Sequence, residues 1–142
     1  MKLAALLFVF ITFCGCHHDP AVVPPNVMKL VGTWELREPL PPYPVQLQLV
    51  LDTDNPPRDV TPFLVSGTIA GSRYEGRSSA GLDGLLVITN LIDIPSTVGS
   101  DVFRQAYLSN LRAVVQFSYT SDNRLRLSYG SSQPGVLMYE KR

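Results

Sequence analysis

The stretch VQFSYTSDNRLRLSY, residues 115–129, decides the fold class. Apolar or aromatic residues occupy every second position on both sides of the turn Ser121-Asp122-Asn123. They are Val115, Phe117 and Tyr119 before the turn and Leu125, Leu127 and Tyr129 after it. Period-2 spacing is typical of half-buried strands, and two such runs around a short polar turn predict a β-hairpin.

The same alternation recurs along the chain from residue 30. One face of residues 30–36 carries Leu30, Gly32, Trp34 and Leu36, and residues 45–51 alternate Val45, Leu47, Leu49 and Leu51 with Gln46, Gln48 and Val50. Further strands are predicted over residues 63–70, 73–79, 85–88 and 136–141. Prolines place a loop over residues 39–44, because proline cannot donate a ladder hydrogen bond, and a second loop covers residues 52–62.

One segment changes the period from two to about four. Phe103, Tyr107 and Leu111 recur every fourth residue, which predicts a helix of about three turns over residues 100–111. Ser100 is a suitable N-cap, and Asp101 suits the positive end of the helix dipole.

About eight strands joined by short turns predict an antiparallel sheet. A sheet with one apolar face must close or be covered, because open edges bind other chains. The sequence therefore predicts a mainly β protein, a small antiparallel β-barrel or half-barrel with one α-helix.

Composition excludes several functions for this domain. Both cysteines and both histidines lie before residue 19, so the usual zinc ligands, disulfides and Cys/His or Ser/His catalytic pairs are missing beyond it. The 12 basic and 12 acidic residues balance, which argues against a nucleic-acid partner held by phosphate contacts. We find no nucleophile-elbow, Ser-x-x-Lys, phosphate-loop or nucleotide motif, and we expect no enzyme activity and no cofactor.

The N-terminus has the pattern of an export signal. Lys2 precedes the apolar run of residues 3–13, which is too short for a membrane-spanning helix of about 20 residues. The segment Phe13-Cys14-Gly15-Cys16 resembles the lipobox of bacterial lipoproteins. That resemblance implies a signal peptide over residues 1–15, cleavage before Cys16 and lipidation of Cys16; the alternative is an ordinary secreted protein with incidental cysteines.

The resemblance also implies a location. His17 after the cysteine, compared with the sorting rule of enteric bacteria, implies anchoring in the cell envelope at the outer membrane, facing the periplasm. Residues 16–29 are interpreted as the lipidated cysteine and a proline-stiffened tether of about a dozen residues, up to about 35–40 Å long. His17 and His18 could bind a metal, but two ligands on a tether make no preorganised site, and we interpret them as its polar start.

The domain predicted over residues 30–142 resembles the META domain (HslJ-like) family of bacterial lipoproteins. The resemblance extends over residues 30–141 and depends on the order of several short pieces: Leu30-Val31-Gly32-Thr33-Trp34, Val65-Ser66-Gly67, Gly71-Ser72-Arg73-Tyr74-Glu75-Gly76, Pro95-Ser96-Thr97-Val98, Tyr107-Leu108-Ser109-Asn110-Leu111, Val115-Gln116-Phe117-Ser118-Tyr119, Leu125-Arg126-Leu127 and Leu137-Met138-Tyr139. Many members carry a Cys-Asn pair after the glycine and a second Cys downstream, and this chain has neither.

The resemblance implies a non-enzymatic envelope module that acts by protein contacts in envelope maintenance or stress response. A second resemblance, through Gly32-Thr33-Trp34 alone, is to lipocalin-like domains, and it implies a carrier of a small apolar ligand. Side-chain volume separates the two functions, because a carrier needs a cavity of a few hundred Å³ inside the barrel.

Two groups of charged residues are the remaining candidates for a site. Asp52 and Asp54 suggest a calcium loop, but Pro57 and Phe63 stand where that loop needs Gly and an acid, so we interpret the segment as a solvated turn. Arg73 and Arg77 with Glu75 between them, and the pair Arg124 and Arg126, could bind anionic headgroups or polysaccharide. The interspersed acids favour an ordinary polar face.

Overall fold

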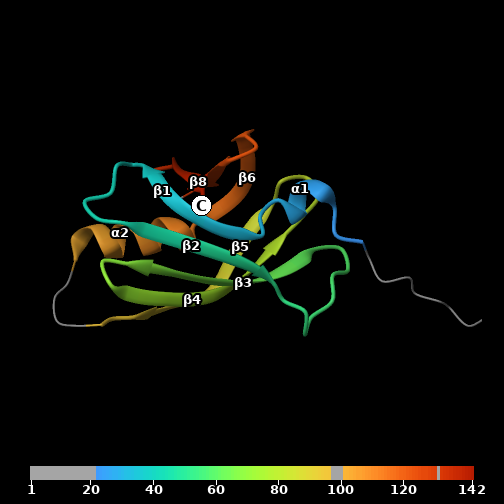
Figure 1. Cartoon of the computed structure of the whole chain (residues 1–142), viewed down its shortest axis with the longest axis horizontal. Helices are drawn as coiled ribbons and strands as arrows, with labels where there is room; N and C mark the ends of the chain where they lie inside the picture. The colour runs from blue at the N-terminus through green and yellow to red at the C-terminus, as the bar shows by residue number, and fades with distance from the viewer. Residues whose placement is uncertain (1–21, 97–100, 131) are drawn as a thin grey trace, which may run out of the picture.

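Strands form most of the structure, a computed structural model that describes residues 22–96, 101–130 and 132–142. Eight described strands build one antiparallel sheet in the order β5-β4-β3-β2-β1-β8-β7-β6 (Figure 1). Their bounds are β1 Gly32–Glu38, β2 Val45–Leu51, β3 Thr61–Ile69, β4 Ser72–Ala80, β5 Leu86–Ile94, β6 Val114–Ser121, β7 Arg124–Tyr129 and β8 Gly135–Lys141. The prediction of a mainly β half-barrel is confirmed.

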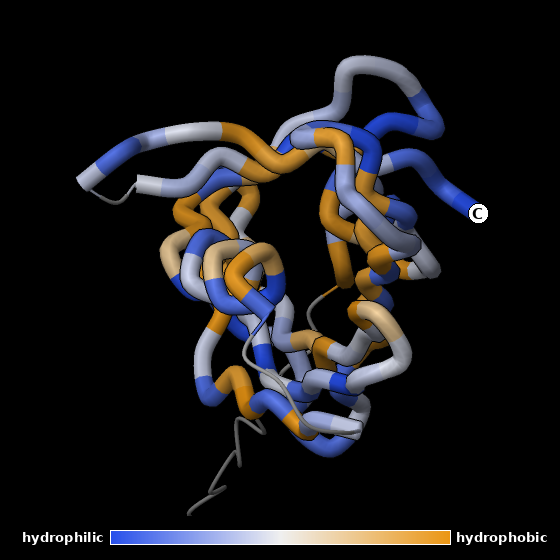
Figure 2. The backbone as a smooth tube through the Cα atoms, turned by 90° about the vertical axis from the view of Figure 1, so that its left-hand side faces the viewer, coloured by the Kyte–Doolittle hydropathy of each residue, from blue (hydrophilic) through white to orange (hydrophobic). Residues whose placement is uncertain are grey.

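The two edge strands meet at only one end of the curled sheet. Phe117 N donates to Gly84 O over 2.8 Å, and Leu85 forms an isolated antiparallel bridge with Gln116. Beyond this point β5 and β6 separate, and helix α2 (Val102–Arg112), which connects them along the chain, packs against β5. Figure 2 views the molecule from the left-hand side of Figure 1, the side on which α2 lies.

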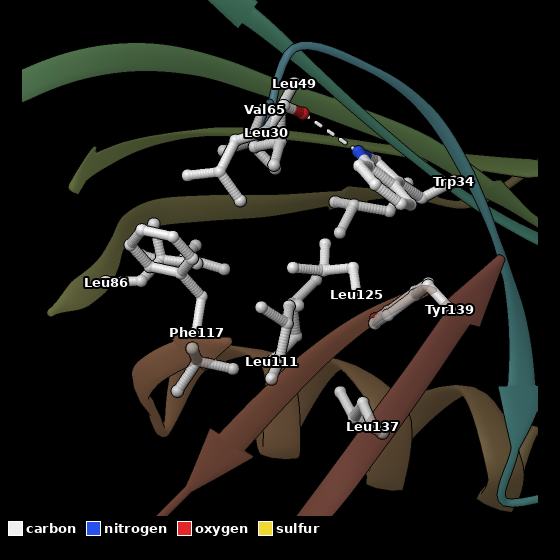
Figure 3. Close-up of a cluster of buried hydrophobic side chains, with 14 of the residues drawn as sticks. Leu30, Trp34, Leu49, Val65, Leu86, Leu111, Phe117, Leu125, Leu137 and Tyr139 are labelled. Atoms are coloured by element: carbon white, nitrogen blue, oxygen red, sulfur yellow. Dashed lines mark hydrogen bonds between the residues drawn. The ribbon is translucent and has the colours of Figure 1, made fainter. Parts of the chain in front are cut away.

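The concave face of the sheet is filled with large side chains (Figure 3). Trp34 is fully buried, and its Nε1 donates to Leu30 O over 2.8 Å. Most of the apolar residues of the predicted strand faces and helix are buried as well: Leu30, Leu36, Leu47, Leu49, Tyr107, Leu111, Phe117, Leu125, Leu127, Leu137 and Tyr139. Leu51, Phe103, Tyr119 and Tyr129 are only partly buried. The prediction is wrong for Val115, which is 43% exposed, because the strand register shifts between Val114 and Gln116 and Val114 is the buried residue there.

Several boundaries differ from the prediction: β1 is shifted by two residues, and β3 begins at Thr61, inside the segment predicted as a loop. Two further differences have local reasons. Strand β5 runs to Ile94, whereas the prediction ended it at residue 88. The alternation of buried and exposed residues breaks there, because Asn90 has a positive φ of 53° and the pairing with β4 contains a bulge. Helix α2 takes Asp101 as its N-cap rather than Ser100: its side chain accepts from Phe103 N at 2.9 Å and Arg104 N at 3.4 Å. Ser100 itself lies outside the described residues.

The predicted tether is shorter than expected. Pro25–Met28 form one helical turn, α1, with proline at the first helical position, and Val27 is fully buried in the core. Tyr119 Oη donates to Asn26 O over 2.9 Å, which fixes this turn to β6. The prediction of an extended segment up to residue 29 is therefore wrong for α1, and the folded domain begins several residues earlier.

Trp34→Ala should lower the free energy of unfolding by about 3–5 kcal/mol, because it empties a buried volume and leaves Leu30 O without its donor. Urea unfolding of the unlipidated chain measures this change. Leu40→Ala is the control, since Leu40 is 89% exposed and its removal should cost almost nothing. A loss below about 1 kcal/mol for Trp34→Ala would contradict a packed interior.

Candidate functional site

The predicted lipidation site lies outside the described residues, as do Cys14, His17 and His18.

The Asp52 segment is a closed polar turn. The Asp52 carboxylate is buried and accepts from Asp54 N at 3.2 Å and Asn55 Nδ2 at 2.9 Å, while Arg77 approaches it at 3.4 Å. The prediction of a solvated turn is correct for Asp54, which is exposed, and wrong for Asp52. Across the described residues, no group of three or more His, Cys, Asp or Glu side chains is placed to hold a metal ion.

The predicted arginine pairs lie on the outer face of the sheet among acids. Arg73 forms an ion pair with Glu75 at 2.7 Å on β4. Arg124 and Arg126 are exposed on β7, and Arg124 lies opposite Glu140 of β8 in the strand register. This alternation of signs gives no continuous positive surface.

A chain of three buried phenols is the main polar feature of the interior, and the sequence patterns did not predict it. Tyr74 of β4, Tyr107 of α2 and Tyr139 of β8 meet inside the half-barrel. The Tyr74 and Tyr107 hydroxyls are 3.0 Å apart, and those of Tyr107 and Tyr139 are 2.9 Å apart. Tyr74 Oη also donates to Gln46 O over 2.7 Å.

This geometry fixes which hydroxyl donates and which accepts in each hydrogen bond among the three phenols. A phenol carries one proton, and Tyr74 uses its proton on the carbonyl of Gln46, which can only accept. Tyr107 must then donate to Tyr74, and Tyr139 must donate to Tyr107. All three buried protons have an acceptor, so the network is satisfied and links four elements, β2, β4, α2 and β8.

Burial raises the pKa of all three phenols. The pKa of Tyr107 rises to about 12, and hydrogen bonds to its two neighbours limit the increase. Desolvation, with the neighbouring phenols adding to it, raises the pKa of Tyr74 and Tyr139 well above the ordinary value of 10. The three hydroxyls are therefore neutral at physiological pH and serve as hydrogen-bonding groups rather than as bases.

A glycine makes room for the first phenol. Gly67 faces Tyr74 across β3 and β4, and a Cβ on Gly67 would lie 2.3 Å from the Tyr74 ring. Strand β3 therefore needs glycine at this point for the Tyr74 ring to lie flat over its backbone. Gly67 and Tyr74 are paired in the register of β3 with β4, which brings the glycine next to the ring.

A second polar cluster lies between α2 and the end of β5. Arg104 of α2, with a side chain only 11% exposed, donates from Nη1 to Ser72 Oγ over 3.1 Å. Its Nε lies 3.5 Å from Asp93 Oδ2, which is an ion pair without hydrogen-bond geometry. The cluster fixes α2 to the β5 edge of the sheet, and nothing in it has the form of a nucleophile with a base.

Four hollows formed by described residues open on the outside of the domain. Their volumes are about 250, 240, 210 and 80 Å³, and none of the four is lined by Trp34 or by the three phenols. The largest lies beside the proline-rich β1–β2 loop, at Leu40 and Tyr43. The hollows of 240 and 80 Å³ share Pro57 and Thr61 at the opposite end.

No protein-family model, curated protein or solved structure matches this chain. Among the described residues, no helix has the length and apolar character needed to cross a membrane.

Tyrosine-to-phenylalanine substitutions should have unequal costs, because the chain of phenols has a direction. Tyr139→Phe removes the first donor and leaves no proton without an acceptor, so we expect a loss below about 1 kcal/mol. Tyr107→Phe leaves the Tyr139 proton buried without an acceptor, and we expect about 1–3 kcal/mol. Denaturant unfolding of both variants measures the difference. Equal costs, or a larger cost for Tyr139→Phe, would contradict the assigned direction.

The folded domain should lose stability above pH 10. A phenol whose folded pKa lies above its unfolded value of 10 contributes its full stability below pH 10, and this contribution is lost as the pH rises toward the folded pKa, about 12 for Tyr107. Phenolate absorbance should show between two and three fewer ionised tyrosines in the folded than in the denatured protein at pH 11 on account of these three phenols. Ionisation of every tyrosine near pH 10 with the fold intact would refute the burial of these hydroxyls.

Proposed function

We propose that this protein is a lipid-anchored protein of the bacterial cell envelope, held at the outer membrane and facing the periplasm. The observation that carries the proposal is the order of an 11-residue apolar run, Gly15 and Cys16. Residues 1–15 are then removed as a signal peptide, and Cys16 becomes the lipidated N-terminus. Several acyl chains hold a protein at a membrane far more firmly than the marginal binding of a single chain.

We further propose that the domain is a META-type module without enzymatic activity, which contacts other envelope proteins in maintenance or stress response. The half-barrel with one long helix is compatible with the order of motifs that resembles this family. The phenol chain supports a structural role for the interior, because each of its protons is already committed to a neighbour.

The filled interior favours this module over the lipocalin-like carrier. A carrier needs an internal cavity of a few hundred Å³, but Trp34, Tyr74, Tyr139 and Phe63 are fully buried where such a ligand would lie. The described hollows are open to the outside rather than enclosed by the sheet.

Cys16→Ser in the full-length precursor should release the protein from the membrane fraction, because the lipid is the proposed attachment. Expression in a bacterium that matures lipoproteins, followed by membrane fractionation, measures the loss. Cys14→Ser is the matched control and should leave the protein in the membrane fraction, since residue 14 leaves with the signal peptide. Retention of the Cys16→Ser protein in the membrane pellet would disprove the anchor.

Titration with a fluorescent fatty-acid analogue separates the module from the carrier. The purified domain should show no saturable binding, because large side chains fill the part of the interior that the described residues form. Tight binding that Trp34→Ala alters would favour the carrier.

A further inference from the structure

Exposed apolar side chains gather at the end of the half-barrel where the described chain begins. Val22 is 89% exposed, Leu82 in the β4–β5 turn is 70% exposed, and Val60 in the β2–β3 loop is 41% exposed. Val22 and Leu82 line one hollow of about 80 Å³ together with Pro57 and Arg58 of the β2–β3 loop. In Figure 1 this is the end with α1 and the N-terminal trace.

Local contacts make this end one surface. Asn26 Nδ2 donates to Leu82 O over 3.4 Å, so α1 lies against the β4–β5 turn. Val23 lines a second hollow with Leu51, Pro56 and Pro62, which joins the β2–β3 loop to the same surface. We refer to the exposed side chains of Val22, Val60 and Leu82 as the apolar end.

The length of chain between Cys16 and Val22 argues for what this end contacts. Val22 follows Cys16 by six positions, so even a fully extended segment keeps Val22 within about 20 Å of the lipidated residue. Strands β3 and β4 have nine residues each and span about 30 Å. The apolar end is therefore the part of the domain closest to the anchor.

We propose that the apolar end docks on the lipid surface that holds the Cys16 anchor, with Leu82, Val60 and Val22 inserted among the headgroups; this inference rests on the proposed lipidation. The charges around these residues indicate which lipids suit it. Asp54, Asp59 and Asp83 are exposed beside Arg58, so the end has more acidic than basic residues. Docking is driven by apolar contact, and it needs no anionic lipid.

The sequence supplies a clean way to test this orientation. Cys14 leaves with the signal peptide and Cys16 is lipidated, so a cysteine introduced into the mature lipoprotein is its only free thiol. Leu82→Cys and Val60→Cys place that thiol on the apolar end. Leu40→Cys is the matched control, because Leu40 is 89% exposed on the β1–β2 loop at the opposite end.

Each lipidated variant is labelled with nitrobenzoxadiazole and reconstituted in phosphatidylcholine–phosphatidylethanolamine vesicles that contain a spin-labelled lipid quencher. We expect quenching at positions 82 and 60 at least about twofold stronger than at position 40, because apolar groups insert about 5–10 Å into the headgroup region. Raising the salt concentration or adding phosphatidylglycerol should not increase the quenching.

Flotation of the vesicles separates failure of the anchor from failure of the docking. If the protein floats but positions 82 and 60 are quenched no more than position 40, the anchor stands and the docking is wrong. If the protein does not float, the proposed lipidation fails and the docking fails with it. The fluorescence of the label at position 82 could instead change with protein concentration and not with the addition of lipid. That result would overturn the docking and assign the apolar end to a contact with a second copy of this chain.

Amide hydrogen exchange tests the same orientation in the lipoprotein without substitutions or label. The comparison of vesicles with detergent micelles should show slower amide exchange on vesicles in residues 81–85 and no change at Leu40 and Tyr43, the two residues of the 39–44 loop that carry an amide hydrogen. If residues 81–85 exchange as fast on vesicles as in micelles, the proposed orientation is wrong.

Discussion

The structure depends on how a sheet with two edges is closed. Strands β5 and β6 are the edges of the sheet, and they meet only near Gly84 and Phe117. Elsewhere α2 lies between them and offers side chains in place of a ladder: Arg112 Nη2 donates to Leu91 O over 3.2 Å. The helix therefore takes the place of a missing strand partner for β5 and covers that edge, which would otherwise be open to other chains.

The half-barrel closed by α2 contains three buried tyrosine hydroxyls, and these satisfy one another by hydrogen bonds. Tyr107 of α2 is the contact point, because its hydroxyl lies within hydrogen-bond distance of both Tyr74 and Tyr139. The hydroxyls add direction to an otherwise apolar core, since each has one proton and a required acceptor. Such a network favours one position of α2 relative to strands β4 and β8.

Much of the fold could be predicted from the sequence, because the signals were local. Alternation predicted β2 with its observed bounds, and the four-residue spacing of aromatic and leucine residues predicted α2. Strand β5 was cut short because a bulge at Asn90 shifts the alternation, and a pattern of period two then appears to end. Pro24 and Pro25 suggested a tether, although a proline at the first position is equally suited to begin a helix.

The polar interior could not be predicted, because it depends on contacts between residues far apart in the chain. Tyr74 meets Tyr107 only through the curl of the sheet and the position of α2, and Gly67 gains its meaning only from the β3–β4 register. The lipobox resemblance, by contrast, needs only adjacent residues, so the sequence carries the anchor proposal without help from the fold.

The two ends of the half-barrel carry different exposed side chains. The core is filled, its buried phenols are committed to one another, and the arginines of β4 are paired with acids. If the apolar end rests on the membrane, the opposite end faces the periplasm. That end carries the exposed Leu40, four nearby prolines and a hollow of about 250 Å³ beside Tyr43. Because prolines hold this loop stiff, a partner that binds there orders little of it, which lowers the entropic cost of contact.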